Sequence, residues 1–205
     1  RFYYGWVIVG VMATVGALST ALGTINFGLF IKPMGDQLGI GRTSFGWAMT
    51  ARLLTGAAAS PFVGRLIDRF GSRILLAVAA TITGTALFTL GHITQAWQMV
   101  ALFAITGIVG LGGPASLVTT VPVAKWFVLR RGRAIGMLFI GLPVGGIIFL
   151  PLTQFLIDSV GWRDAWAVLA AMGAGTIIPL SLTLVRRQPE DMGLLPDGAD
   201  PEKAN

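Results

Sequence analysis

The sequence has no cysteine and a single histidine, His92. Without cysteine, disulfide bonds and thiolate metal sites are excluded, and one histidine cannot form a cluster of imidazole ligands. No phosphate-binding P-loop is present, and no nucleophile is paired with a base inside an apolar segment. The sequence therefore predicts neither an ATP-driven pump nor a hydrolase, and we expect no catalytic residues, no metal and no cofactor.

Charge is also scarce. Charged residues make up 12% of the 205 residues and hydrophobic residues 54%, whereas a soluble domain carries roughly 25% charged residues. Six apolar segments approach the length of about 20 residues that crosses a bilayer. They cover residues 4–31, 45–63, 74–90, about 99–121, about 134–157 and about 165–185. Glycine pairs such as Gly141 and Gly145 would let these helices pack closely. The sequence predicts an all-α membrane protein with six transmembrane helices.

The basic residues are distributed unequally between the two sets of loops. One set holds Arg1, Arg65, Arg69, Arg73, Lys125, Arg130, Arg131, Arg133, Arg186 and Arg187, and the other holds Lys32, Arg42 and Arg163. Because cytoplasmic loops are enriched in Lys and Arg, both termini should be cytoplasmic in a multi-pass cell-membrane protein, which we expect to be a bacterial inner-membrane protein. This placement explains the net charge of +6 without a nucleic-acid partner.

Composition changes sharply after Arg187. Residues 188–205 are polar, contain proline and are mildly acidic. We therefore expect a transmembrane domain over residues 1–187 and a mobile cytoplasmic linker or tail over residues 188–205.

One loop carries a specific motif. The stretch Gly64–Arg73 reads Gly-Arg-Leu-Ile-Asp-Arg-Phe-Gly-Ser-Arg and resembles the signature of the major facilitator superfamily between its second and third helices. Glycine at the first position would permit close helix approach, and the second glycine a tight turn. An aspartate among arginines can form charge-assisted hydrogen bonds that lock one conformation and break in another. We expect a conformational gate made of Gly64, Asp68, Arg69, Gly71, Arg73 and Arg133.

Longer stretches are similar to the monocarboxylate and oxalate/formate branch of this superfamily. They are residues 26–33, residues 125–136, Gly161-Trp162-Arg163, and the run from Arg187 to Gly198. The resemblance implies two three-helix units related by an inverted repeat, as in the N-terminal half of such transporters. It also implies a partner that completes the path, either a missing C-terminal six-helix half or a second copy. Thr106 stands where proton-coupled drug antiporters carry an arginine, so the resemblance does not favour drug export.

Arg52 is the main candidate for contact with a solute. It lies near the middle of the second apolar segment, and no acidic residue lies inside any of the six segments. A charge at that depth costs about 2.5–3.5 kcal/mol on insertion scales, and an anionic substrate could bind it through paired hydrogen bonds. Alternatively, Arg52 extends toward the surface or pairs with an acid in another half. Further candidates are Asn26, Thr24, Thr119 and Gln154, which could instead form hydrogen bonds between helices.

These patterns together predict a secondary transporter, either an antiporter or a symporter. We expect it to move small organic anions, monocarboxylates above all, across the lipid bilayer by alternating access. The alternatives are a facilitator or exporter of sugar-like or amphipathic solutes, and a membrane assembly factor that transports nothing.

Overall fold

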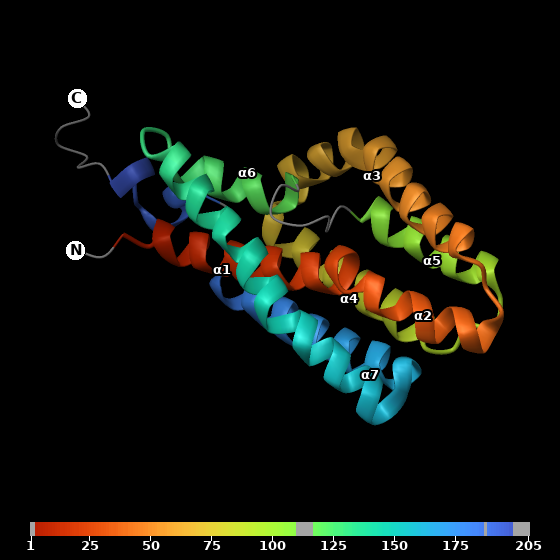
Figure 1. The fold of residues 1–205 in the computed structure, drawn as a ribbon. Helices are drawn as coiled ribbons and strands as arrows, with labels where there is room; N and C mark the ends of the chain where they lie inside the picture. The colour runs from red at the N-terminus through yellow and green to blue at the C-terminus, as the bar shows by residue number, and fades with distance from the viewer. Residues whose placement is uncertain (1–2, 110–116, 187, 199–205) are drawn as a thin grey trace.

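The computed structural model describes residues 3–109, 117–186 and 188–198, and it is helical throughout apart from short turns. Helix α1 (Gly5–Thr20) continues through a short π-helix, η1 (Ala21–Ile25), into α2 (Phe27–Leu38). Then come α3 (Arg42–Phe70), α4 (Ser72–Leu90), α5 (Ala96–Ile108), α6 (Leu117–Trp126) and α7 (Arg131–Leu184). Two 3-10 turns follow, η2 (Pro189–Met192) and η3 (Pro196–Gly198) (Figure 1).

The helices follow the predicted apolar segments but differ at their ends. The first segment extends seven residues past its predicted end at Ile31, to Leu38. The fourth is described as two helices, α5 and α6, and residues 110–116 between them lie outside the described chain. The fifth and sixth form one helix, α7, because no loop separates them.

Helix α7 cannot run straight through a bilayer. Its 54 residues would extend about 80 Å at the helical rise of about 1.5 Å per residue, far beyond a hydrocarbon core of about 30 Å. The helix bends at Gly161, whose φ of 84° and ψ of 163° are not helical and are accessible to glycine. The bend leaves two arms, residues 131–160 and residues 162–184.

By length and composition, two helices in the described ranges could cross a membrane, α4 and α7. The apolar helices α1 and α5 are shorter. Helix α3 is 29 residues long but carries five charged residues, Arg42, Arg52, Arg65, Asp68 and Arg69. The helix is therefore long enough to cross a bilayer, but its charges lower its mean hydropathy.

Three helix pairs hold the structure together: α3 with α5, α1 with α7, and α4 with α7. Small residues set how closely they approach. A Cβ added at Gly145 of α7 would lie 2.7 Å from the carbonyl oxygen of Ala17 and 3.0 Å from its Cα atom. A Cβ added at Gly84 of α4 would lie 3.0 Å from Cβ of Ala174. The predicted glycine packing is therefore confirmed at Gly145.

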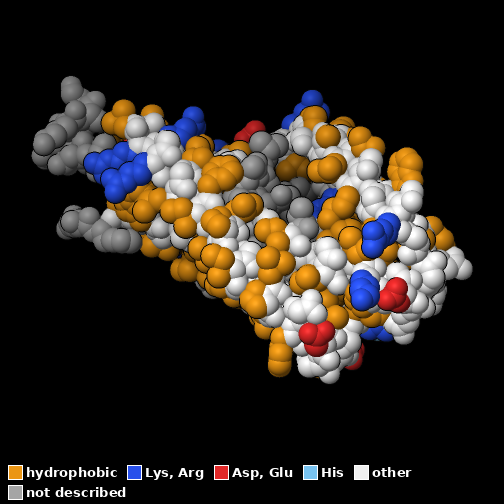
Figure 2. All heavy atoms as spheres, in the orientation of Figure 1, with side chains coloured by type: hydrophobic (Ala, Val, Ile, Leu, Met, Phe, Trp, Pro, Cys, Tyr) orange, Lys and Arg blue, Asp and Glu red, His pale blue; other side chains and the backbone are white. Residues whose placement is uncertain are grey.

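The outer surface is rich in apolar side chains. Leu53, Phe62, Ile147 and Phe155 are among the large hydrophobic residues that are more than half exposed. Figure 2 shows apolar side chains spread over the visible face, with charged ones mostly toward its two ends. Such a surface would be unusual on a monomeric protein in water and is suited to lipid.

The two ends of the helical body differ. The start of α1, the α6–α7 turn and the end of the described chain lie at one end (Figure 1), which we call the basic end. At the opposite end, the Trp162 indole donates a hydrogen bond to Gln37. There Arg163 donates to the carbonyl oxygens of Gly91, at 2.8 Å, and Ile93, at 3.2 Å. These bonds join the ends of α2 and α4 to the bend of α7.

The segment after α7, which we expect to be a linker or tail, contacts the helical body. Residues 188–198 fold back on the basic end and form hydrogen bonds with it. Composition alone does not record the particular hydrogen bonds that a short segment can make. Residues 199–205, together with Arg1 and Arg187 of the predicted basic side, lie outside the described residues.

We predict that Gly145→Leu destabilises the fold, because its side chain would overlap the Ala17 backbone. Overpacking of this kind costs about 1–3 kcal/mol, which thermal unfolding of the detergent-solubilised chain would detect. The matched control is Gly136→Leu in the same helix, where no atom of the described residues lies within 4 Å of an added Cβ. Equal melting temperatures for the two variants would contradict the packing described here.

Candidate functional site

Arg52 lies inside the helical body. Its side chain is 8% exposed, and its guanidinium donates a hydrogen bond to the carbonyl oxygen of Gly23 in η1. A methyl group added at Gly23 would overlap the guanidinium, so the lack of a side chain there makes room for Arg52. Single π turns inside α-helices are frequent at functional sites. Arg52 and η1 therefore form the core of the candidate site.

Helix α5 fixes the position of Arg52 from the other side. The Thr55 hydroxyl donates a 2.8 Å hydrogen bond to the carbonyl oxygen of Ala104. A side chain at Gly107 would overlap both the Arg52 carbonyl oxygen and the Thr55 hydroxyl. Because α3 and α5 are in backbone contact here, the depth and direction of Arg52 are set by packing.

Asn26 follows η1 directly and is fully buried. Its side-chain amide donates to the Thr153 hydroxyl at 2.5 Å and to the Phe149 carbonyl oxygen at 3.2 Å, both in α7. Its Oδ1 atom is buried and has no hydrogen-bond partner among the described residues. Asn26 thus joins α1 and α2 to α7 and retains one acceptor that a solute or a water molecule could use.

The other predicted solute-binding residues do not all lie together. Thr119 is fully buried in α6. Gln154 is exposed and donates a 2.9 Å hydrogen bond to Asp158, so it lies apart from the buried Asn26. The side chain of Thr24 lies outside the described part of the structure.

A separate hollow lies between α1 and α7. It has a volume of about 720 Å³ and its lining is mostly apolar, including Ala13, Met137, Ile148 and Phe149, with Thr14 and Thr176 as polar members. Neither Arg52 nor Asn26 lines it. The hollow therefore suits an apolar or amphipathic group rather than an isolated charge.

The predicted gate residues lie at the basic end. Asp68 is 3.6 Å from Nζ of Lys125, and the two side chains are 76% and 34% exposed. This ion pair links the end of α3 to the end of α6. Exposed pairs of this kind contribute about 0–1 kcal/mol, so the link can break at little cost.

The glycines of the motif behave differently from each other. Gly71 has a φ of 77°, which confirms the predicted tight turn between α3 and α4. A Cβ added at Gly64 meets no described atom within 4 Å, so the close approach that we expected there is not found within the described chain. Arg69 lies over the Phe70 ring and Arg133 over the Trp6 ring.

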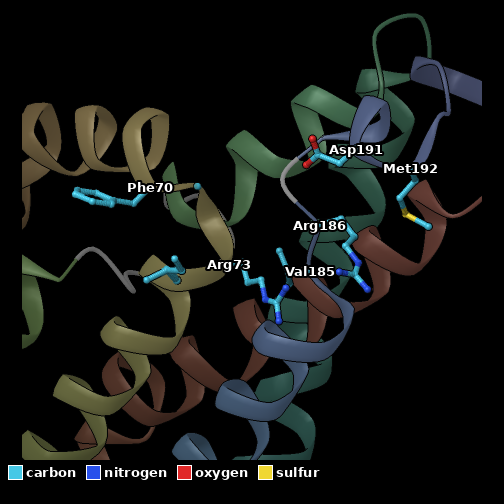
Figure 3. A pocket seen from close by; sticks show the side chains of 8 residues that line it. Phe70, Arg73, Val185, Arg186, Asp191 and Met192 are labelled. Atoms are coloured by element: carbon cyan, nitrogen blue, oxygen red, sulfur yellow. The ribbon is translucent and has the colours of Figure 1, made fainter.

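Arg73 lines a second pocket at the basic end, shown in Figure 3. It has a volume of about 410 Å³ and lies between the α3–α4 turn and the residues after α7. Phe70, Ile74, Val185 and Met192 give it apolar walls, and Arg186 and Asp191 add charge. The pocket shows that the motif faces the segment that follows α7.

Sequence reasoning missed three parts of the site: η1, Thr153 and the contact at Gly107. A glycine inside the first segment, Gly23, was the available signal for η1. Nothing in the sequence indicated that Thr153 lies opposite Asn26, 127 residues earlier.

Comparison with known proteins gives a family. The profile of the Major Facilitator Superfamily matches residues 13–203. The chain is 27% identical to mouse monocarboxylate transporter 11 over 173 residues, which is 82% of this chain and 37% of that protein. It is 24% identical to human monocarboxylate transporter 1 over 170 residues, 82% of this chain and 33% of that protein. The chain therefore spans about a third of the length of these relatives.

A solved structure gives the fold. The inward-open xylose transporter XylE from E. coli superimposes with a TM-score of 0.68 at 17% sequence identity. The superposition covers 92% of this chain and 49% of that transporter. At this identity the likeness establishes the helical architecture alone.

We predict that Gly23→Ala destabilises the protein, by about 1–3 kcal/mol, because its methyl group would displace the Arg52 guanidinium. The matched control is Gly28→Ala, where an added Cβ meets nothing within 4 Å in the part of the chain that the structure describes. Thermal unfolding of both variants in detergent would measure the difference.

A double-mutant cycle with Arg52→Ala sharpens this test. Once the guanidinium is absent, Gly23→Ala should cost no more than Gly28→Ala. An undiminished cost in the Arg52→Ala background would show that Gly23 is required for a reason other than Arg52.

Proposed function

Because the chain belongs to the Major Facilitator Superfamily, a family of membrane transporters rather than enzymes, we propose that it is the N-terminal half of a secondary transporter for small organic anions. Monocarboxylates are the solutes we favour, and alternating access is the mechanism. The monocarboxylate transporters among its relatives support this choice of solute.

The observation that carries the proposal is the buried charge of Arg52. Guanidinium groups keep their proton in proteins and present a planar fork of donors that matches a carboxylate. In our proposal the fork binds the carboxylate of the solute, and the Gly23 carbonyl oxygen holds the group in place. Asn26, Thr119 and Thr24 would contribute hydrogen bonds, while Gln154, which is exposed, would act apart from the buried Asn26 and Thr119.

We assign six transmembrane spans as follows. The first is α1 with η1 and α2, the second α3, the third α4, the fourth α5 with α6, and the last two are the arms of α7. Spans one to three would correspond to spans four to six by an inverted repeat. A further six-helix half or a second copy would complete the path, which agrees with the greater length of the relatives.

We place the basic end in the cytoplasm, following the positive-inside rule. The transmembrane domain in this proposal is residues 1–187, and residues 188–205 are a cytoplasmic linker. The Asp68–Lys125 pair, together with Arg69, Arg73 and Arg133, would stabilise one state of the gate. Being exposed and weak, the pair could exchange partners when the halves rock.

A second candidate is a facilitator of amphipathic solutes. The apolar hollow of about 720 Å³ between α1 and α7 favours it, since such a solute would find little polar surface there. In that case Arg52 would not bind the solute, and its role would be structural, through its hydrogen bond to η1.

We predict that Arg52→Gln lowers uptake of radiolabelled lactate, formate or oxalate about 10- to 100-fold. This follows from the loss of a charged hydrogen-bonding partner worth about 1.5–3 kcal/mol. Uptake would be measured in proteoliposomes that contain the intact gene product. Arg52→Lys should recover only part of the activity, because it keeps the charge but loses the fork.

The control is Arg42→Gln, an exposed arginine at the start of the same helix. It should leave uptake within about twofold of wild type, as expected for a surface substitution. Normal uptake of all three anions by Arg52→Gln would move the assignment to the amphipathic-solute facilitator.

A further inference from the structure

The segment after α7 makes one unusually dense contact with the rest of the chain. The carboxylate of Asp197 accepts hydrogen bonds from the backbone N–H groups of three successive residues, Val128, Leu129 and Arg130. The distances are 2.8, 2.7 and 3.1 Å. These residues form the turn between α6 and α7.

The turn offers these donors because of its place in the chain. The last bond of α6 joins the Phe127 N–H to the Val123 carbonyl oxygen, and the first of α7 joins the Ala134 N–H to the Arg130 carbonyl oxygen. Six N–H groups, those of residues 128–133, lie between these two bonds, where a helix end leaves N–H groups without a helical carbonyl. The first three of them are the donors to Asp197. Successive N–H groups of this kind make an anion-binding concavity, and the positive pole of α7 adds to its preference for negative charge.

Asp197 is suited to this position by its backbone as well as its carboxylate. Its φ of 59° is the only positive φ of a non-glycine residue among the described residues. Aspartate and asparagine tolerate this region better than other side-chain-bearing residues. Glycine would also adopt it but has no carboxylate, and asparagine has only one acceptor oxygen. Of these three residues, only aspartate both tolerates the positive φ and offers two carboxylate oxygens to the three N–H donors.

Electrostatics favour the charged form of the side chain. Burial raises the pKa of the Asp197 carboxyl, but the three backbone hydrogen bonds and the Arg130 charge lower it by more, so its pKa lies below the usual value. The group is therefore ionised at neutral pH, as an acceptor of three hydrogen bonds requires.

A second contact ties the same segment to α1. The Tyr3 hydroxyl lies 2.8 Å from the carbonyl oxygen of Trp126 and 3.3 Å from that of Leu195. The Tyr3 ring also packs against Phe127, with ring centroids 5.5 Å apart. Tyr3, two residues before α1, thus contacts both the end of α6 and the segment after α7.

We propose that residues 189–198 are an intramolecular clasp that fixes the α6–α7 turn, with Asp197 as its anchor and the three backbone N–H groups of residues 128–130 as its docking site. The clasp positions Arg130, Arg131 and Arg133, because all three belong to that turn or to the first turn of α7. Clasp and turn move as one body when the basic end rearranges.

The first test is hydrogen exchange of the full chain in detergent. Asp197→Asn should lower the protection of the amides of residues 128–130 by about tenfold or more, since charged hydrogen bonds are lost. Asp197→Gly should do the same, because it keeps the backbone conformation and removes the carboxylate. Asp191→Asn is the matched control, a removal of the same charge from an exposed residue of the same segment, and should leave protection unchanged.

A second measurement covers the case in which a variant folds poorly. The chain has no cysteine, so spin labels can be placed at Leu129→Cys and Asp191→Cys, both exposed positions. With Asp197 present, the distance distribution between the labels should be narrow, and in Asp197→Asn it should broaden while α4 keeps its exchange protection. A narrow distribution or unchanged protection at residues 128–130 in Asp197→Asn would overturn the clasp.

Discussion

A guanidinium group inside an apolar body needs an oxygen atom beside it, and this requirement shapes the helices around Arg52. Arg52 is the one charged side chain that is buried among the described residues. The π turn at Ala21–Ile25 presents the Gly23 carbonyl oxygen to it. Both Gly23 and Gly107 leave room for Arg52 by having no side chain. The π turn is therefore matched to the buried charge, whereas the close approach of α3 and α5 is matched to the Arg52 backbone at Gly107.

The helix ends are held by charged side chains of opposite sign. At one end, Arg163 donates to carbonyl oxygens at the end of α4, and at the basic end Asp197 accepts from N–H groups before α7. Each charge has the sign that stabilises the helix pole it meets. Each also joins segments far apart in the sequence, so that the polar backbone groups at helix ends are used for tertiary contacts.

The sequence was sufficient to predict the family, the all-helical class and the approximate helix positions, because these depend on composition and on the Gly64–Arg73 motif. It drew attention to Arg52, which the structure buries, because charge is rare in apolar segments. It could not predict which way each helix faces, since a helix apolar on all sides gives no amphipathic signal. The pairing of Asn26 with Thr153 and the exposure of Gln154 both depend on that rotation. The docking of Asp197 depends on one backbone conformation, which composition does not record.

The bend at Gly161 also bears on how the protein enters its membrane. The two arms of α7 are joined by a single non-helical residue, so no loop separates them. With each arm as a span, as proposed above, the two would enter the membrane as a helical hairpin. A replacement for Gly161 that favoured a straight helix would act during biosynthesis, before any packed structure exists, and its effect would be measured as failed insertion.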